Sequence, residues 1–269
     1  MLSNISRFLT YSLAALYAIL GALLFFMPER LAPVFAWKVT PFVTMTIGGW
    51  CLGNAWLAFF AARRWEWNRV YIALMYFWLF GVSELLVVYL FRAKLSLGHP
   101  IAWLYLGTLI VNTMAALIGA FDWLRLRPTI NSSAPARTTT LQLTALTGFI
   151  LAVGFLGYYG CTAKIGDLGT NGGIFPEVMS VFTLRSFGVF YLSLALPPIS
   201  LLRNRDLKPF LNYGFLAYGL IVSITAAAFV HIRLFDFAAR PGGFLYFGAY
   251  LAVGITFLLY FRNHGTGAR

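Results

Sequence analysis

Charged residues are scarce in this sequence. Only 10% of its 269 residues are Asp, Glu, Lys or Arg, whereas a soluble domain has roughly a quarter. Hydrophobic residues make up 60%, more than a water-soluble core of this size could hide behind a polar surface. The composition therefore argues against a soluble domain and favours a protein embedded in a lipid bilayer, which is the first partner that we expect.

Acidic residues are scarcer than basic ones. Eight acids face 20 lysines and arginines, which gives a net charge of +12. Such a charge could suggest nucleic acid as a partner, but the basic residues are scattered in short loops rather than gathered on a polar domain. Basic loops are expected in membrane proteins from the positive-inside bias, so we expect no nucleic-acid partner.

Cysteine and histidine are also few. The two cysteines, Cys51 and Cys161, form no Cys-x-x-Cys pair. Two imidazoles, His99 and His231, could hold a haem, but interfacial histidines at helix ends are common, so we expect no cofactor and no metal site. No metalloprotease, serine-hydrolase or phosphate-binding motif is present. A membrane-embedded enzyme is accordingly the least favoured function class.

Long apolar runs dominate the chain. A run of about 20 apolar residues crosses a hydrocarbon core as a helix, and the runs are continuous rather than alternating, which excludes membrane strands. We therefore predict an all-α, polytopic membrane protein with eight transmembrane helices, at about 8–27, 41–62, 70–91, 101–121, 141–160, 178–200, 210–231 and 243–261.

The loop charges predict the orientation. With the N-terminus inside, 12 basic residues fall in inner segments and seven in outer ones, and the last, Arg185, lies within a span. This bias places both termini in the cytoplasm. The short loops suggest a bacterial-type inner membrane.

The two halves of the chain resemble each other. A shift of 140 residues aligns 35–84 with 175–224 without a gap and matches Gly48 with Gly188 and Arg63 with Arg203. We predict two parallel four-helix repeats, 1–123 and 141–269, joined by a cytoplasmic linker, 124–140, and related by an axis along the membrane normal. The pair Pro197-Pro198 should kink or end the sixth span.

Two opposite charges lie inside the predicted spans. Glu84 and Arg185 each sit seven residues from an outer span end, roughly 10 Å below the surface at 1.5 Å per residue. Equal depth predicts a direct ion pair between the halves, either as a ligand site or as a structural bond that fixes helix register. The positions equivalent to Arg185 and Glu84 in the other half are Met45 and Ile224, so the polar site occurs only once.

Further polar side chains are candidates for the outer lining of this site, namely His231, Arg92 and Lys164. We expect a protein that binds or transports a small molecule or lipid through an outward-facing polar site between the repeats. The alternative is a non-catalytic subunit of a larger complex with a membrane-protein partner. A cavity of a few hundred Å³ that reaches Arg185 would favour the first class over the second.

Overall fold

The structure is a computed structural model that describes residues 2–128, 137–163, 174–205 and 207–264. Within these ranges every regular element is a helix, so the all-α prediction is confirmed there. In chain order the helices are α1 (Asn4–Phe26), α2 (Pro28–Leu31), η1 (Ala32–Val34), α3 (Pro41–Arg63), α4 (Trp67–Leu90), η2 (Arg92–Lys94), α5 (Pro100–Leu126), α6 (Thr140–Thr162), α7 (Val181–Ala195), α8 (Ile199–Asn204), α9 (Leu207–Val230), η3 (Ile232–Leu234) and α10 (Gly242–His264).

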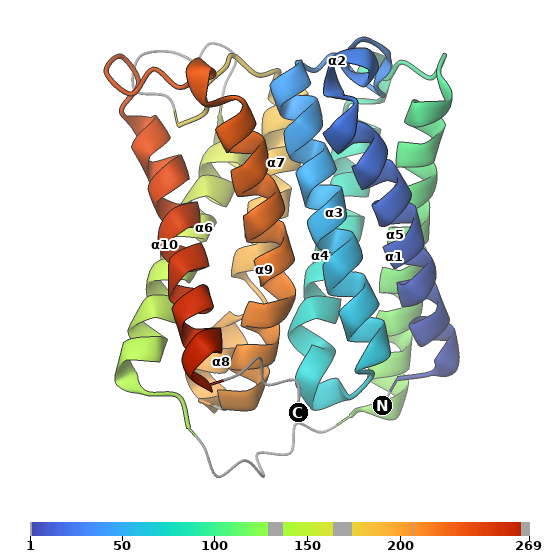
Figure 1. Cartoon of the computed structure of the whole chain (residues 1–269). Coiled ribbons are helices and arrows are strands. Elements are labelled where there is room, and N and C mark those ends of the chain that lie inside the picture. Colours follow the sequence, from blue (N-terminus) through green and yellow to red (C-terminus); the bar gives the residue numbers. More distant parts are fainter. Residues whose placement is uncertain (1, 129–136, 164–173, 206, 265–269) are drawn as a thin grey trace.

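The long helices stand side by side in one bundle (Figure 1). The bundle has two ends. At one end, called the proximal end here, α1 begins and α10 ends; the opposite, distal end carries the short helices α2, η1, η2 and η3. All residues of the candidate site described below belong to the distal end or to the bundle interior beneath it.

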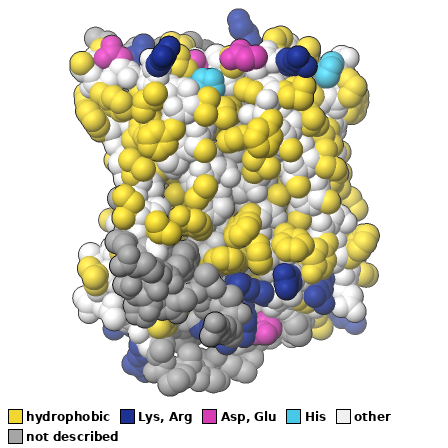
Figure 2. All heavy atoms as spheres, in the orientation of Figure 1, with side chains coloured by type: hydrophobic (Ala, Val, Ile, Leu, Met, Phe, Trp, Pro, Cys, Tyr) yellow, Lys and Arg dark blue, Asp and Glu magenta, His cyan; other side chains and the backbone are white. Residues whose placement is uncertain are grey.

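Seven helical segments of the described chain are long and apolar enough to cross a membrane. They are α1, α3, α4, α5, α6, the α7–α8 segment and α9. The eighth predicted span coincides with α10, whose apolar part, Gly242–Ile255, is shorter. Figure 2 shows hydrophobic side chains over the middle of the molecule and charged side chains toward its two ends. This is the architecture of a multi-pass membrane protein.

Several helices begin at side chains that cap them. Thr40 accepts a hydrogen bond from the Val43 amide at 3.2 Å, and Ser180 does the same for Thr183 at 3.1 Å. These caps satisfy amides that a helix start leaves without intrahelical partners. They fix the distal starts of α3 and α7, and both caps also face the cavity described below.

Glycines allow the closest helix contacts. A Cβ on Gly48 would lie 2.5 Å from the Phe25 nitrogen of α1, and one on Gly188 would lie 2.5 Å from the Cys161 nitrogen of α6. Larger residues at these positions would push the helices apart. The two glycines therefore place α3 against α1 and α7 against α6.

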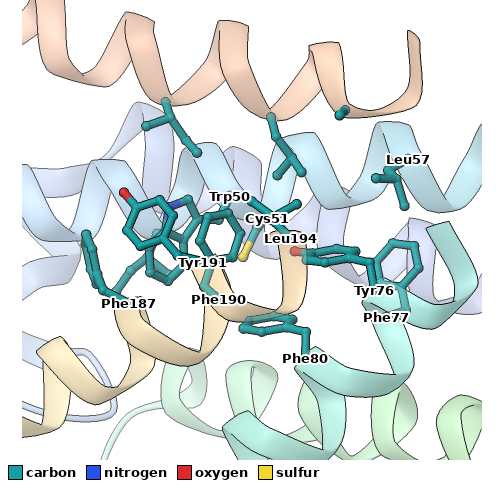
Figure 3. Close-up of a cluster of buried hydrophobic side chains, with 14 of the residues drawn as sticks. Trp50, Cys51, Leu57, Tyr76, Phe77, Phe80, Phe187, Phe190, Tyr191 and Leu194 are labelled. Atoms are coloured by element: carbon teal, nitrogen blue, oxygen red, sulfur yellow. The ribbon is translucent and has the colours of Figure 1, made fainter. Parts of the chain in front are cut away.

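Aromatic side chains fill the bundle interior between α3, α4 and α7 (Figure 3). The Trp50 ring of α3 stacks on the Phe190 ring of α7, with centroids 4.1 Å apart and planes 7° from parallel. Tyr76 of α4 stacks on Phe80 of the same helix and meets Phe190 edge-on at 6.3 Å. This cluster joins the two halves of the chain just beneath the candidate site.

The pair Pro197-Pro198 interrupts the sixth apolar segment, as predicted. Helix α7 ends at Ala195 and α8 begins at Ile199, with the two prolines in the turn between them. Proline lacks the amide hydrogen that a continuing helix needs. The regular helix that carries Arg185 is therefore short, and its distal part alone faces the cavity.

Candidate functional site

Glu84 lies in the interior of the bundle. It belongs to α4, and its side chain is only 2% exposed. The Tyr105 hydroxyl of α5 donates a hydrogen bond to the Glu84 Oε1 atom at 2.6 Å. The other carboxyl oxygen, Oε2, has no hydrogen-bond partner among the described residues. The carboxyl group is therefore held by one helix neighbour and is only half satisfied.

A small cavity, called the buried cavity here, lies beside Glu84. It has a volume of about 20 Å³ and is lined by residues of α1, α3, α4, α5 and α7, together with Trp37. Among the lining residues are Trp50, Asn54 and Ser186, and each of these has a buried side-chain nitrogen or oxygen without a partner in the described structure.

The predicted ion pair between Glu84 and Arg185 is wrong. Among the described residues the one salt bridge joins Arg69 to Glu66. Arg185 instead donates from Nη1 to the Gly160 carbonyl at 2.7 Å and from Nη2 to the Ala163 carbonyl at 2.8 Å. The reason is that Arg185 points from α7 toward α6, away from α4.

Arg185 thereby caps the end of a neighbouring helix. Gly160 lies in the last turn of α6 and Ala163 follows the helix, so their carbonyls have no amide partner further along the helix. A cation is favourable at a helix C-terminus, where the helix dipole is negative. Because a guanidinium has five N–H donors and these bonds use two, the others remain for a further partner.

A larger cavity, called the distal cavity here, lies at the distal end between the two halves. Its volume is about 910 Å³, and both Arg185 and residues at the start of α3 line it. Three of its lining residues are cations and three carry hydroxyl groups: Lys38, Lys94, Arg185, Thr40, Ser180 and Thr183.

The rest of the distal cavity is mostly apolar. Val43 and Phe91 contribute from the first half, and Val178, Met179 and Val181 from the second. The lining contains no carboxylate among the described residues, although Glu177 lies next to it and accepts a hydrogen bond from the Thr40 hydroxyl. Positive charge beside an apolar wall suits an anionic group attached to an apolar body.

One side chain separates the two cavities. Trp37 lines the buried cavity, and its indole N–H donates to the hydroxyl of Thr183, which lines the distal cavity, at 3.1 Å. The Trp37 ring stacks on Phe182 at 4.4 Å and meets Tyr105 edge-on at 5.2 Å. A continuous set of contacts thus runs from the distal cavity through Trp37 and Tyr105 to Glu84.

The other predicted lining residues do not line the distal cavity where the structure describes them. His231 packs edge-on against Phe42 at 5.6 Å, and Arg92 donates to the Tyr89 carbonyl at 3.1 Å on the exposed surface. Lys164 lies outside the described residues. Sequence reasoning missed Lys38 and Lys94, because a position in a short loop does not reveal which way a lysine points.

The described residues contain no group of three or more His, Cys, Asp or Glu side chains arranged to hold a metal ion. The arrangement instead offers fixed and flexible cations in the distal cavity and an isolated carboxyl in the buried one. The chain matches no protein-family model, and neither a curated protein nor a solved structure is significantly similar to it.

Proposed function

We propose that this protein binds or transports a small molecule or lipid whose anionic group enters the distal cavity. The observation that carries the proposal is a cavity of about 910 Å³, between the two halves of the chain, with Lys38, Lys94 and Arg185 in its wall. Its size lies in the range of ligand pockets, and it reaches Arg185. This combination favours a binding protein over a purely structural subunit, whose core would have no such space.

The three cations play different parts in this proposal. Arg185 is held in place by the Gly160 and Ala163 carbonyls, so its remaining N–H donors are preorganised for a planar anion such as a carboxylate or phosphate. Lys38 and Lys94 are exposed, flexible point charges at the cavity wall. The arginine therefore positions the anion, and the lysines attract it and adapt to its shape.

The apolar wall narrows the ligand class. Phe91 and Val178 come from opposite halves of the chain and line the same space as the cations. An amphiphile could place its charged head near Arg185 and its apolar body against these side chains. An anionic lipid head group and a free organic anion share this chemistry, and the experiment below separates them.

The proposal includes eight spans with both termini in the cytoplasm. Loop charges support this orientation, because most basic residues belong to the segments on the side of the termini. The length of α10, Gly242–His264, supports an eighth span, since 23 helical residues are enough to cross a hydrocarbon core. The distal cavity then opens toward the outside of the cell membrane.

The proposal also includes two parallel repeats. Helices α3 and α7 begin 140 residues apart, at Pro41 and Val181, and α4 and α9 match at both ends with the same shift. Gly48 against α1 corresponds to Gly188 against α6. The stacked pair of Trp50 and Phe190 occupies equivalent positions, which supports an axis passing between these rings.

The contact of Gly21 with Leu52 has a counterpart in that of Gly157 with Leu192. A Cβ would meet the leucine backbone nitrogen at 2.7 Å in the first case and at 2.8 Å in the second. Because the two contacts involve residues at matching positions of the two halves, they support the duplication independently of the helix boundaries.

Native mass spectrometry of the purified protein with its lipids tests the binding function. We expect a bound anionic lipid or organic anion, retained by the Arg92→Ala variant and lost from the Lys38→Ala/Lys94→Ala variant. Arg92 is the matched control because it is an exposed cation at the same end that does not line the cavity. Protein that carries only zwitterionic lipid, or equal retention by both variants, would refute the proposal. A lipid and a free anion differ in mass, so the same spectrum separates the two sources.

A further inference from the structure

The buried cavity beside Glu84 has room for one water molecule. Its volume of about 20 Å³ exceeds the roughly 10–15 Å³ that a single water requires and leaves no space for a second. Apolar cavities of this size stay empty, whereas polar ones with two to four hydrogen-bonding partners hold ordered water. The polar atoms at the wall therefore decide what the cavity contains.

Four polar side-chain atoms without partners belong to residues that line this cavity. They are Glu84 Oε2, Ser186 Oγ, Trp50 Nε1 and Asn54 Nδ2, and none of the four residues is more than 4% exposed. Buried polar atoms in folded proteins nearly always have a partner. Four such atoms around one cavity indicate a shared partner inside it.

The donors and acceptors of these atoms match those of one water. The Trp50 indole N–H can only donate. The Tyr76 hydroxyl donates to Asn54 Oδ1 at 2.7 Å, which leaves the amide N–H groups of Asn54 as donors toward the cavity. Glu84 Oε2 accepts, and the Ser186 hydroxyl can accept as well. A water that accepts two hydrogen bonds and donates two satisfies all four atoms.

A metal cation fits the same site poorly. Sodium, magnesium and calcium require several oxygen ligands, and only the Glu84 carboxyl and the Ser186 hydroxyl among the four offer one. The N–H groups of Trp50 and Asn54 would point their positive ends at the ion. The chemistry of the donor set therefore selects water over a cation.

We propose that the buried cavity is a specific water site, in which one ordered water accepts from Trp50 and Asn54 and donates to Glu84 and Ser186. The water joins α3 and α4 of the first half to α7 of the second, at the place where a direct ion pair was predicted. It also gives the carboxyl group of Glu84 a partner for proton exchange in an interior that bulk water does not reach. The site is independent of whether the distal cavity binds an anion.

Thermal unfolding of the full-length protein in detergent distinguishes a filled cavity from an empty one by the sign of the effect. In a filled cavity, Ser186→Ala and Trp50→Phe each remove a partner of the water, so each should lower the unfolding midpoint, Ser186→Ala by about 2–4 °C. In an empty cavity, the same changes remove unsatisfied polar atoms, so the midpoint should stay or rise. The double variant should lose less than the sum of the single ones, because both contacts depend on one water.

Ser193→Ala is the control for these variants. Ser193 is buried on the same helix, but its hydroxyl bonds to the Val189 carbonyl of that helix and does not reach the cavity. Midpoints at or above this control, or strictly additive effects, would overturn the proposal. An experimental structure that resolves waters gives a second test, independent of any variant. We expect one water within hydrogen-bond distance of Glu84 and Ser186, and an empty cavity or a Ser186 hydroxyl bonded directly to Glu84 would contradict it.

Discussion

The two cavities differ in size, charge and the way their charged groups are held. The distal cavity, of about 910 Å³, is lined by three cations, and its arginine is anchored by two backbone carbonyls. The buried cavity, of about 20 Å³, contains a single carboxyl group with one hydrogen bond. The first is built to receive a charged ligand from outside, and the second to keep one polar group within an apolar interior. Opposite charges at similar depth thus serve separate sites.

Arg185→Met should have the largest effect, because it changes both the distal cavity and the fold. It introduces the residue found at the equivalent position of the first half, Met45. The loss of two charge-assisted bonds to the Gly160 and Ala163 carbonyls should destabilise the protein by about 3 kcal/mol. Thermal unfolding in detergent measures this change.

Arg92→Met provides the comparison for that variant, since it removes an exposed cation at the same end and should change stability by less than about 0.5 kcal/mol. Equal midpoints for the two methionine variants would show that Arg185 does not cap α6.

Tyr105→Phe should have the next largest effect and should act on the buried cavity alone. It removes the one hydrogen bond that the described structure gives to the Glu84 carboxyl, at a cost of about 2 kcal/mol. Chemical unfolding in detergent reports this cost.

Tyr213→Phe is the matched substitution, because Tyr213 is also buried but donates to the neutral Leu194 carbonyl at 3.0 Å. We expect a cost of about 1 kcal/mol there. If Tyr213→Phe is the more damaging of the two, Glu84 does not depend on Tyr105.

Trp37→Phe should have the smallest effect on stability and tests the separation between the cavities. It keeps an aromatic ring against Phe182 but loses the hydrogen bond to Thr183, at a cost of about 1 kcal/mol. Because the ring shrinks beside the buried cavity, the Glu84 carboxyl should exchange its proton for deuterium faster, as followed by its infrared band. Unchanged exchange would show that Trp37 does not limit access to Glu84.

Much of the fold could be predicted from the sequence, because continuous apolar runs determine membrane helices directly. The helix break at Pro197-Pro198 and the tight packing at Gly48 also follow from single residue types with strong local effects. The last span was harder to establish, since the apolar part of α10, Gly242–Ile255, is short.

The pairing within the candidate site could not be predicted in the same way. Counting residues gives the depth of a side chain in the membrane, but not its direction around the helix. Successive residues on a helix differ by about 100°. Arg185 accordingly faces α6, while Ser186, one residue later, lines the buried cavity with Glu84. Which of the two faces meets α4 depends on helix packing that no local pattern encodes.

The anion affinity of the distal cavity tests the central proposal most directly. Isothermal titration of the detergent-solubilised protein would use inorganic phosphate, a short-chain anionic lipid and its zwitterionic counterpart, each against the unmodified protein, Lys38→Ala/Lys94→Ala and Arg92→Ala. We predict binding of at least one anion, weakened about tenfold or more in the double variant, which corresponds to about 1.4 kcal/mol, and unchanged in Arg92→Ala. Absence of anion binding, or equal affinity in the double variant and the unmodified protein, would contradict the proposed function.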